Sequence, residues 1–382
     1  MKVILITDQH IGARNDNLSF VKYFKKFYDE VFFPYIDKHD IKTIINLGDM
    51  FDRRKYVNFN TLHFTKETWL EPLRKRNINV HCLIGNHDTY FKNTNDINSC
   101  NLLFDEYENI HVYPEPEVIE FGGVSVLFMP WMNSENYPQC VKYLQQAKAD
   151  ICFGHLELSG FEQHKGHWAQ QGYDKDLFKR FELVFSGHYH RKSDDGQIYY
   201  LGSPYEMTWS DYECPKGFHV FDLDTRELTR IQNPHRIHKK IYFDDKKNNY
   251  DEHDITQYKE CYVKVIVVNK TDFYKFDKFA DKLMNDSGIY NEKNYMSNEL
   301  IYNALTKSAE LKGVNGPFMN SMIDAQNNIV GGKKSKSKKI SKPFLDACKI
   351  ASCPRALKLT LPTFIMQRSG SRESTIFLKA SR

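Results

Sequence analysis

Five short apolar segments in this chain each give way abruptly to Gly, Asp, Asn or His, and this repeated pattern restricts the fold more than any other feature. The segments are residues 3–7, 43–47, 80–84, 151–153 and 183–186. Continuous apolar runs of this kind are typical of strands that are buried on both faces of a sheet. Helical spacing in 18–38 predicts a helix after the first strand, and a second helix is expected over 61–76, where Pro72 should kink or end it. We therefore predict an α/β protein.

The pattern changes twice further along the chain. Residues 197–232 contain short strand-like runs without helices, which predicts a second sheet packed on the first. Residues 1–235 should therefore form a two-sheet sandwich flanked by helices. After this part, 262–268 is expected to be a strand and 272–284 an amphipathic helix. We interpret residues 236–330 as a smaller α+β domain.

The end of the chain carries most of the positive charge. Gly331 and Gly332 open a lysine-rich run, so residues 331–382 are predicted to form a basic, disordered tail. Residues 333–382 hold 13 Lys and Arg and 2 Asp and Glu, a balance of +11. Because the net charge of the whole chain is +4, the preceding 332 residues carry −7. Composition alone therefore does not establish that the folded part binds nucleic acid.

Cysteine usage and the N-terminus indicate the compartment. The eight cysteines are scattered and form no CxxC pair, so neither a disulfide scaffold nor a structural zinc site is expected, and a reducing cytoplasm fits best. The apolar run from Val3 to Ile6 is too short for a signal peptide, and no stretch is long enough to span a membrane. We expect a cytoplasmic protein.

Side chains that can bind metal follow all five apolar segments. They are Asp8, His10, Asp49, Asn86, His155, His188 and His190. The carboxyl ends of neighbouring strands share one edge of an α/β sheet, where loops leave a crevice for ligands. Asp8 and His10 lie two residues apart and point to the same side of an extended chain, and His188 and His190 share this spacing. Oxygen and imidazole donors without thiolates favour Mn²⁺, Fe²⁺ or Zn²⁺.

Each of these motifs is weak by itself, because a single Gly-His or Asp-x-His is usually a capped turn or a solvated loop. Their joint occurrence predicts a two-metal site. Two divalent ions about 4 Å apart can hold a phosphodiester and activate a water near neutral pH. The charges of Asp8 and Asp49 would leave such a site with about +2, which suits an anionic ester. The sequence therefore predicts a phosphoesterase.

The order of the motifs resembles that of the calcineurin-like metallophosphoesterase superfamily. It reads Asp8-Gln9-His10, Gly48-Asp49-Met50-Phe51-Asp52, Gly85-Asn86-His87-Asp88, Gly154-His155 and Gly187-His188-Tyr189-His190. The resemblance implies one ion held by Asp8, His10, Asp49 and His190, and another held by Asp49, Asn86, His155 and His188. It casts His87 as the acid that assists the leaving oxygen. Asp52 and Asp88 are expected to orient the ligands.

Further stretches are similar to the SbcD-type exonuclease subunit of DNA double-strand-break repair, including the recombination endonuclease subunit of tailed phages. These stretches are residues 6–12, 48–53, 154–158 and 202–205. The resemblance implies an Mn²⁺-dependent exonuclease with some endonuclease action on double-stranded DNA ends, in break processing, recombination and replication. It also implies an SbcC-type, SMC-like ATPase as partner, allows a homodimer, and makes 236–330 a capping domain that helps to grip DNA.

Several alternatives remain open at this stage. A small-molecule phosphodiesterase acting on cyclic nucleotides carries similar motifs, and a catalytically inactive scaffold is a more distant possibility. A Ser/Thr phosphatase is disfavoured, because Arg54 and Asp88 replace the Gly and Glu of the phosphatase motifs. His164 and His167 could contact substrate, although a solvated loop is the simpler interpretation. Tyr189 is expected to point away from its neighbours and to pack.

Overall fold

The structure is a computed structural model that describes residues 1–285. The chain divides into two compact units, Met1–His238 and a second that begins at Lys239. The predicted basic tail, and the part of the predicted small domain beyond residue 285, lie outside the described residues.

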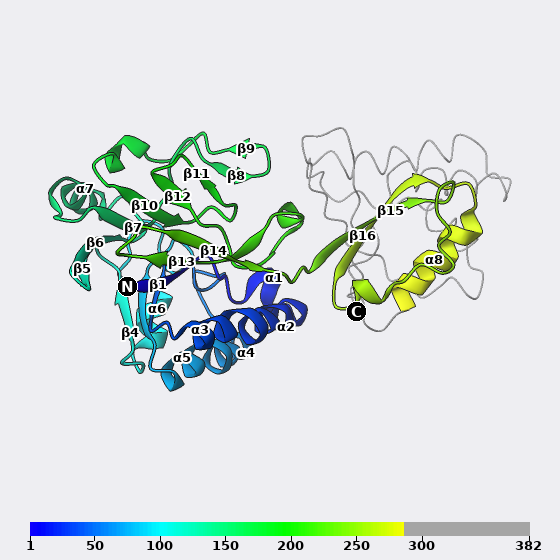
Figure 1. The fold of residues 1–382 in the computed structure, drawn as a ribbon, viewed down its shortest axis with the longest axis horizontal. Coiled ribbons are helices and arrows are strands. Elements are labelled where there is room, and N and C mark those ends of the chain that lie inside the picture. The colour runs from blue at the N-terminus through cyan, green and yellow to red at the C-terminus, as the bar shows by residue number, and fades with distance from the viewer. Residues whose placement is uncertain (286–382) are drawn as a thin grey trace, which may run out of the picture. The chain divides into compact units, whose positions relative to one another are not determined.

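The first unit contains two six-stranded sheets, and the first of them has the order β14-β13-β1-β2-β3-β4 (Figure 1). Its strands are β1 (Lys2–Ile6), β2 (Thr43–Asn46), β3 (Asn79–Leu83), β4 (Ile110–Tyr113), β13 (Lys216–Asp222) and β14 (Leu228–Asn233). The strands from β1 to β4 are parallel. Strand β13 pairs antiparallel with both β1 and β14.

The second sheet has the order β11-β12-β10-β7-β6-β5. Its strands are β5 (Glu117–Phe121), β6 (Val124–Met129), β7 (Ile151–His155), β10 (Leu183–Gly187), β11 (Ser193–Asp194) and β12 (Ile198–Tyr200). Strands β6, β7, β10 and β12 are parallel, and β5 and β11 are antiparallel to their neighbours.

The predicted sandwich is confirmed, but its division into sheets was wrong. We expected the strands of residues 197–232 to form the second sheet. Strand β12 does lie there, whereas β13 and β14 join the first sheet beside β1. Without this hairpin, β1 would be an edge strand with unpaired backbone groups, and the hairpin covers that edge. The second sheet is built instead on β7 and β10, together with β5 and β6, which the sequence interpretation missed.

Apolar side chains fill the space between the two sheets. Val3 and Leu5 of β1 belong to the same buried cluster as Phe153 of β7 and Phe185 of β10. Because side chains alternate along a strand, Ile4 of β1 faces the other side of the first sheet, where it is also buried. This burial on both faces explains why these strands are continuous apolar runs in the sequence.

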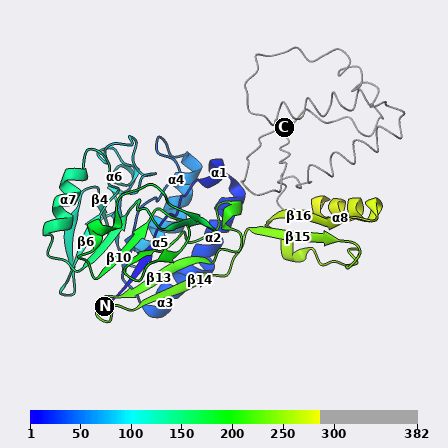
Figure 2. The same cartoon turned by 90° about the horizontal axis from the view of Figure 1, so that it is seen from above.

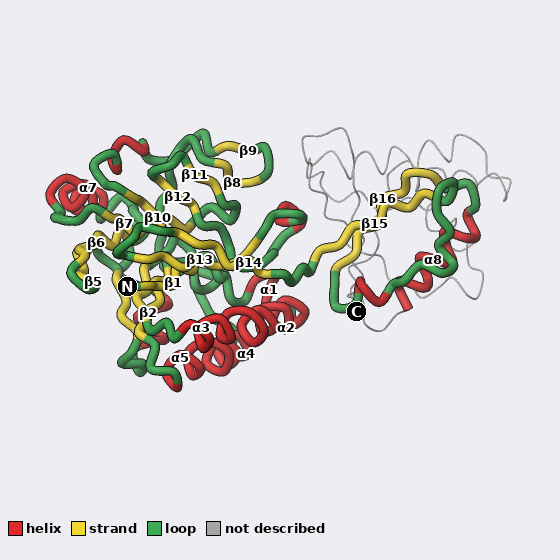
Figure 3. Tube along the Cα trace, viewed as in Figure 1, coloured by secondary structure: helices red, strands yellow, loops and turns green. Residues whose placement is uncertain are grey.

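Helices cover the outer faces of the sandwich, and Figure 3 shows α2 to α5 together on one side of the first sheet. Rings of Phe27 and Phe32 contact Phe218 of β13. The two predicted long helices are each interrupted by a π-helical turn. The first runs through α2 (Leu18–Phe27), η1 (Tyr28–Phe32) and α3 (Phe33–His39), and the second through α4 (Phe59–Thr65), η2 (Lys66–Leu70) and α5 (Glu71–Lys75).

Proline explains both interruptions. Pro34 and Pro72 are the second residues of α3 and α5. A proline inside a helix lacks its N–H and clashes with the preceding turn. A wider turn absorbs the mismatch, since Phe33 N–H donates to the carbonyl of Tyr28, five residues earlier. Pro72 therefore modifies the predicted second helix without ending it.

The remaining elements of the first unit are short. They are α1 (Ala13–Asp16), α6 (Ser99–Phe104), α7 (Tyr137–Gln146), η3 (Lys175–Phe178), η4 (Trp209–Asp211), and the hairpin of β8 (Glu162–His164) and β9 (His167–Trp168). Helix α7 covers the outer face of the second sheet, where Cys140 and Leu144 pack against Cys152 of β7.

The second unit contains a two-stranded sheet, β15 (His238–Asp244) and β16 (Tyr262–Asn269), with η5 (Thr256–Tyr258) and α8 (Phe273–Asn285) (Figure 2). Phe243, Val263 and Phe276 lie in one buried cluster, so α8 packs on the sheet. The predicted strand and helix are both present. The Asp272 carboxylate accepts the first backbone N–H groups of α8, as expected of a capping residue. Among residues 1–285, none of the helices is both long and apolar enough to span a bilayer.

Candidate metal centre

The predicted donor residues lie where the carboxyl ends of strands from both sheets meet. Within the first sheet, the Asp8 N–H donates to the Gly48 carbonyl (3.0 Å) and the His10 N–H to the Asp49 carbonyl (3.0 Å). Between the sheets, His155 Nδ1 lies 2.7 Å from the Leu47 carbonyl oxygen. Because a carbonyl can only accept, Nδ1 carries a proton, and Nε2 is the nitrogen that can bind a metal ion.

Close approach of the two sheets explains one glycine of the motifs. A Cβ placed on Gly187, at the end of β10, would lie 2.0 Å from Thr7 Oγ1 at the end of β1. Any side chain there would push the two sheets apart. Glycine is therefore required by packing before His188.

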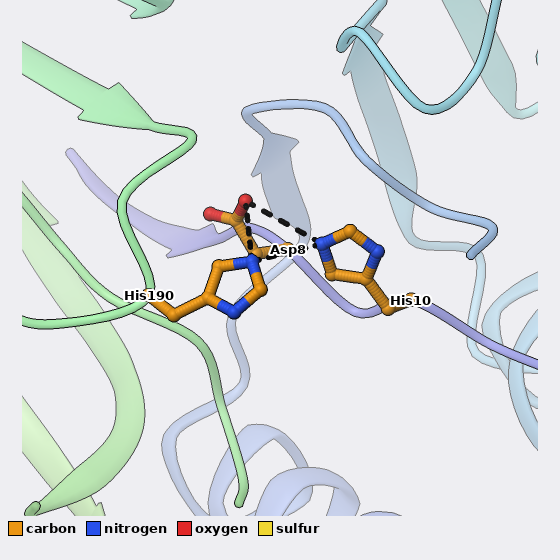
Figure 4. Close-up of side chains that lie close together, drawn as sticks. All are labelled: Asp8, His10 and His190. Atoms are coloured by element: carbon orange, nitrogen blue, oxygen red, sulfur yellow. Dashed lines mark hydrogen bonds and ion pairs between the residues drawn. The ribbon is translucent and has the colours of Figure 1, made fainter. Parts of the chain in front are cut away.

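Asp8, His10 and His190 form the first group of donors (Figure 4). His10 Nε2 and His190 Nε2 are 3.0 Å apart. The Asp8 Oδ1 atom lies 3.9 Å from His10 Nε2 and 3.8 Å from His190 Nε2. Figure 4 shows His190 arriving from a different loop than Asp8 and His10. Residues that are 180 positions apart in the sequence thus present donor atoms to one point.

Asp49, His155 and His188 form a second group, which also contains Asn86. His155 Nε2 lies 3.4 Å from Asp49 Oδ2 and 3.1 Å from Asn86 Oδ1. His188 Nδ1 lies 2.9 Å from the same amide oxygen. Asp49 Oδ2 is also 3.6 Å from His10 Nε2. Asp49 therefore lies between the two groups.

The spacing of these atoms fits divalent cations. Donors about 2.1 Å from one ion are about 3.0 Å apart at octahedral angles and about 3.4 Å apart at tetrahedral angles. Neighbouring donors in the two groups are separated by 2.9 to 3.9 Å. The donor set of imidazole nitrogens, carboxylates and one amide suits Mn²⁺, Fe²⁺ or Zn²⁺. The residues present therefore fit two divalent ions.

Four of the candidate ligands have a strained backbone. Asp8, His10, Asp49 and His188 all have positive φ angles, of 52°, 42°, 56° and 86°. This region is unfavourable for residues with a side chain, and such strain gathers at functional sites. Side-chain bonds hold the strained backbone in place, for example the His188 N–H, which donates to the Asp8 carboxylate at 3.1 Å.

Asp88 and Asp52 contact the backbone or side chains of these donors. The buried Asp88 carboxylate accepts the N–H groups of Asp49 (2.8 Å), Met50 (3.0 Å) and Gly85 (2.9 Å). It thereby joins the loops after β2 and β3. Asp52 Oδ1 lies 3.5 Å from His10 Nδ1. Contacts of this kind can orient metal ligands, and the orienting role of Asp52 and Asp88 stays a prediction.

Electrostatics in the centre differ from one histidine to the next. Burial lowers the pKa of His10, but the nearby carboxylates, led by Asp52, outweigh burial and raise it to about 9. Burial opposes the charge of His155 as well, and the Asp49 carboxylate raises that pKa to about 9. Burial and the charge of His155 lower the pKa of His188 to about 3. The buried carboxylates attract positive charge, which cations can supply in place of protons.

His87 lies at the edge of the centre. Its Nδ1 atom is 2.6 Å from the Asp52 carbonyl oxygen, so Nδ1 carries a proton and Nε2 does not take part in this hydrogen bond. Its backbone N–H donates to Asp49 Oδ1 at 2.7 Å. His87 also forms a group of possible ligands with His10 and Asp49. Geometry therefore allows His87 to be either a ligand or a proton donor.

The other residues singled out in the sequence supply no ligand to this cluster. His164 and His167 belong to the exposed β8–β9 hairpin and face each other across it, so the expected loop is a short two-stranded sheet. Tyr189 is 3% exposed and donates its hydroxyl to the Leu158 carbonyl, as its expected packing role requires. Sequence reasoning missed Lys216, a buried lysine next to His190.

A two-sheet sandwich with Asp, Asn and His donors clustered at the meeting strand ends is the arrangement of a metallophosphoesterase. Comparison with known proteins agrees. The chain belongs to the calcineurin-like phosphoesterase family, whose sequence model matches residues 1–192.

Relatives within this family include nucleases. The chain is 31% identical over 285 residues to exonuclease subunit 1 of Enterobacteria phage T4, covering 74% of this chain and 82% of that protein. It is 29% identical over 241 residues to the DNA double-strand break repair protein Mre11 of Sulfolobus acidocaldarius, covering 58% and 60%. It is 22% identical over 262 residues to the SbcD component of the nuclease SbcCD from Staphylococcus saprophyticus, covering 60% and 67%.

Proposed function

We propose that this phosphoesterase is an Mn²⁺-dependent DNA nuclease, an exonuclease with some endonuclease action on double-stranded ends. The observation that carries the proposal is the pair of donor groups that meet at Asp49. The similarity to a phage exonuclease, a break-repair protein and a component of a two-part nuclease supports DNA as the substrate.

We assign the donors to two ions. Asp8, His10, Asp49 and His190 would hold one, and Asp49, Asn86, His155 and His188 the other. When bound, two divalent ions neutralise charge on the scissile phosphate and make a water acidic enough to attack it. The protein's own part is to orient these ligands and to exclude alternative geometries. The hydrogen bonds that the Asp88 carboxylate accepts, and the burial of the ligands, serve this purpose.

Of the two roles that geometry allows, we assign proton donation to His87. Its Nδ1–H donates to the Asp52 carbonyl, and this hydrogen bond fixes the orientation of the ring. Nε2 is then the atom that can pass a proton to the leaving oxygen. The ring stands nearly perpendicular to that of His10, with 4.7 Å between the ring centroids.

We further propose a role in break processing, recombination and replication, together with an SbcC-type, SMC-like ATPase. The small unit is proposed to cap the centre and to contribute to the grip on DNA. A cavity of about 340 Å³ in this unit supports the grip, because five lysines line it against two carboxylates, Asp245 and Asp251. They are Lys246, Lys247, Lys275, Lys278 and Lys282. Lysines arranged in this way suit a phosphate backbone.

The test is to incubate the purified full chain and Mn²⁺ with end-labelled linear duplex DNA, a covalently closed circle, a cyclic dinucleotide and a phosphopeptide. We expect the linear duplex to be degraded fastest and the closed circle slowly. The His188→Ala variant serves as the control for contaminating nucleases. Preferred hydrolysis of the cyclic dinucleotide would replace this proposal with a small-molecule phosphodiesterase.

A further inference from the structure

Lys216, at the start of β13, is fully buried beside the metal centre, with a side chain that is 0% exposed. Its ammonium group lies 2.7 Å from Asp211 Oδ1, 2.7 Å from the His190 carbonyl oxygen and 2.9 Å from Ser203 Oγ. A buried ammonium group is costly unless it is paired and hydrogen-bonded. Here three acceptors match its three N–H donors.

Asp211, the carboxylate that pairs with Lys216, accepts hydrogen bonds through both of its oxygens. Asp211 is 4% exposed, and its second carboxylate oxygen accepts the N–H groups of Met207 (3.0 Å) and Thr208 (2.9 Å). Hydrogen bonds therefore connect the two ends of the segment 203–216 with its middle. These bonds are charge-assisted, and such bonds are stronger than neutral ones.

These hydrogen bonds fix the backbone at His190. The His190 carbonyl accepts from Lys216 Nζ and also from the Ser203 N–H (3.2 Å). Gly202 presses against the same carbonyl, because a Cβ at Gly202 would lie 3.0 Å from it. The imidazole of His190 extends from this fixed backbone and places its Nε2 atom 3.0 Å from that of His10.

We propose that Lys216 is a positioning residue that, with Asp211, fixes His190 and thereby sets the affinity of one metal position. The inference rests on the proposed function, in which His190 is a ligand. Residues that orient metal ligands typically contribute about 10- to 100-fold to metal affinity. The other metal position does not include His190, so its affinity should not depend on Lys216.

The test uses a double variant, because Lys216→Met alone would leave the Asp211 carboxylate buried without a partner. In Lys216→Met/Asp211→Asn, the Asn oxygen still accepts the N–H groups of Met207 and Thr208. Mn²⁺ is titrated by calorimetry into the full chain, and melting temperature is recorded in parallel. We expect one of two Mn²⁺ affinities to fall about 10- to 100-fold, with the other within about twofold of the wild type.

Arg180→Met is the control, since this more exposed cation also donates to backbone carbonyls, those of Leu144 and Ala147. It should lower the melting temperature and leave both Mn²⁺ affinities unchanged. Wild-type affinities in the double variant, or equal weakening of both, would overturn the role of Lys216. A wild-type chain that binds fewer than two ions would instead refute the proposed two-metal centre.

Discussion

The two sheets contribute different chemistry to the candidate metal centre. Loops after β1, β2 and β3 of the first sheet supply Asp8, His10, Asp49 and Asn86. In the second sheet, the last residue of β7 is His155, and the loop after β10 supplies His188 and His190. All of the carboxylates, including Asp52 and Asp88 beside the candidate ligands, therefore come from the first sheet, and the second supplies imidazoles alone.

The two halves are also held in opposite ways. In the first half a buried anion, Asp88, gathers backbone N–H groups. In the second half the His190 carbonyl accepts from a buried cation, Lys216, which β13 of the first sheet supplies. The comparison teaches that retention of the ions should depend on charge from the first half. The choice of ion should depend on the imidazole ligands, of which three come from the second half and one, His10, from the first.

The largest effect is expected when charge is removed from the first half. Asp49→Asn keeps an oxygen that can accept the His87 N–H, yet it removes the negative charge between the two donor groups. Cleavage should fall by about 10⁴-fold, equivalent to about 5.5 kcal/mol, and both Mn²⁺ affinities should weaken. His188→Ala is the comparison from the second half and should weaken one ion. Calorimetry that finds either ion unaffected by Asp49→Asn would contradict the bridging position.

His87 tests the comparison of the two halves further, because it belongs to the first sheet's half of the centre but should not hold an ion. His87→Ala should keep two Mn²⁺ ions while DNA cleavage falls by about 10²–10⁴-fold, the usual contribution of a positioned general acid. The loss should shrink on bis-p-nitrophenyl phosphate, whose leaving group needs little protonation. Rates on both substrates and metal stoichiometry are measured together. Loss of an ion would make His87 a ligand, and equal losses on both substrates would exclude the acid role.

Metal exchange examines the second half directly. Activity should be absent in chelator and should return better with Mn²⁺ than with Mg²⁺ at equal free concentration. Mg²⁺ prefers oxygen ligands and retained waters, whereas the second half offers nitrogen atoms. The measurement is the initial rate on linear duplex DNA across a titration of each ion. Full recovery with Mg²⁺ alone would count against the assigned donors.

The smallest effect concerns a buried histidine of the first sheet outside the centre. His219 of β13 is 1% exposed, and burial, followed by the charges of Arg230 and Lys192, lowers its pKa to about 3. Between about pH 3 and 6.5 the unfolded chain binds a proton that the folded chain refuses, so stability falls as pH decreases through this window. His219→Phe should therefore raise the unfolding free energy at about pH 5 by about 1–2 kcal/mol relative to its effect at about pH 8.

Urea unfolding of both proteins at the two pH values measures this difference. An equal change at both pH values would show that His219 does not titrate on unfolding. Such a result would remove the difference between His219 and the histidines His10 and His155, whose pKa values are raised to about 9.

Local patterns determined the elements that carry the donors. The apolar runs that became β1, β2, β3, β7 and β10 are continuous because they are buried on both faces, and a strand of this kind can be recognised without its neighbours. The glycines and polar residues after each run mark where the strand ends. For this reason the seven candidate donors could be named from the sequence, although their role as ligands stays a prediction.

Only the tertiary structure decided how the strands are shared between the sheets and what holds His190. Strand β13 pairs with β1, although most of the first unit separates the two strands in the sequence, and nothing in the local pattern of either strand specifies such a distant partner. Lys216 looks like any surface lysine in the sequence, because burial of a charge is possible only where other segments supply its acceptors. Those acceptors, Asp211, Ser203 and the His190 carbonyl, meet Lys216 only in the folded chain.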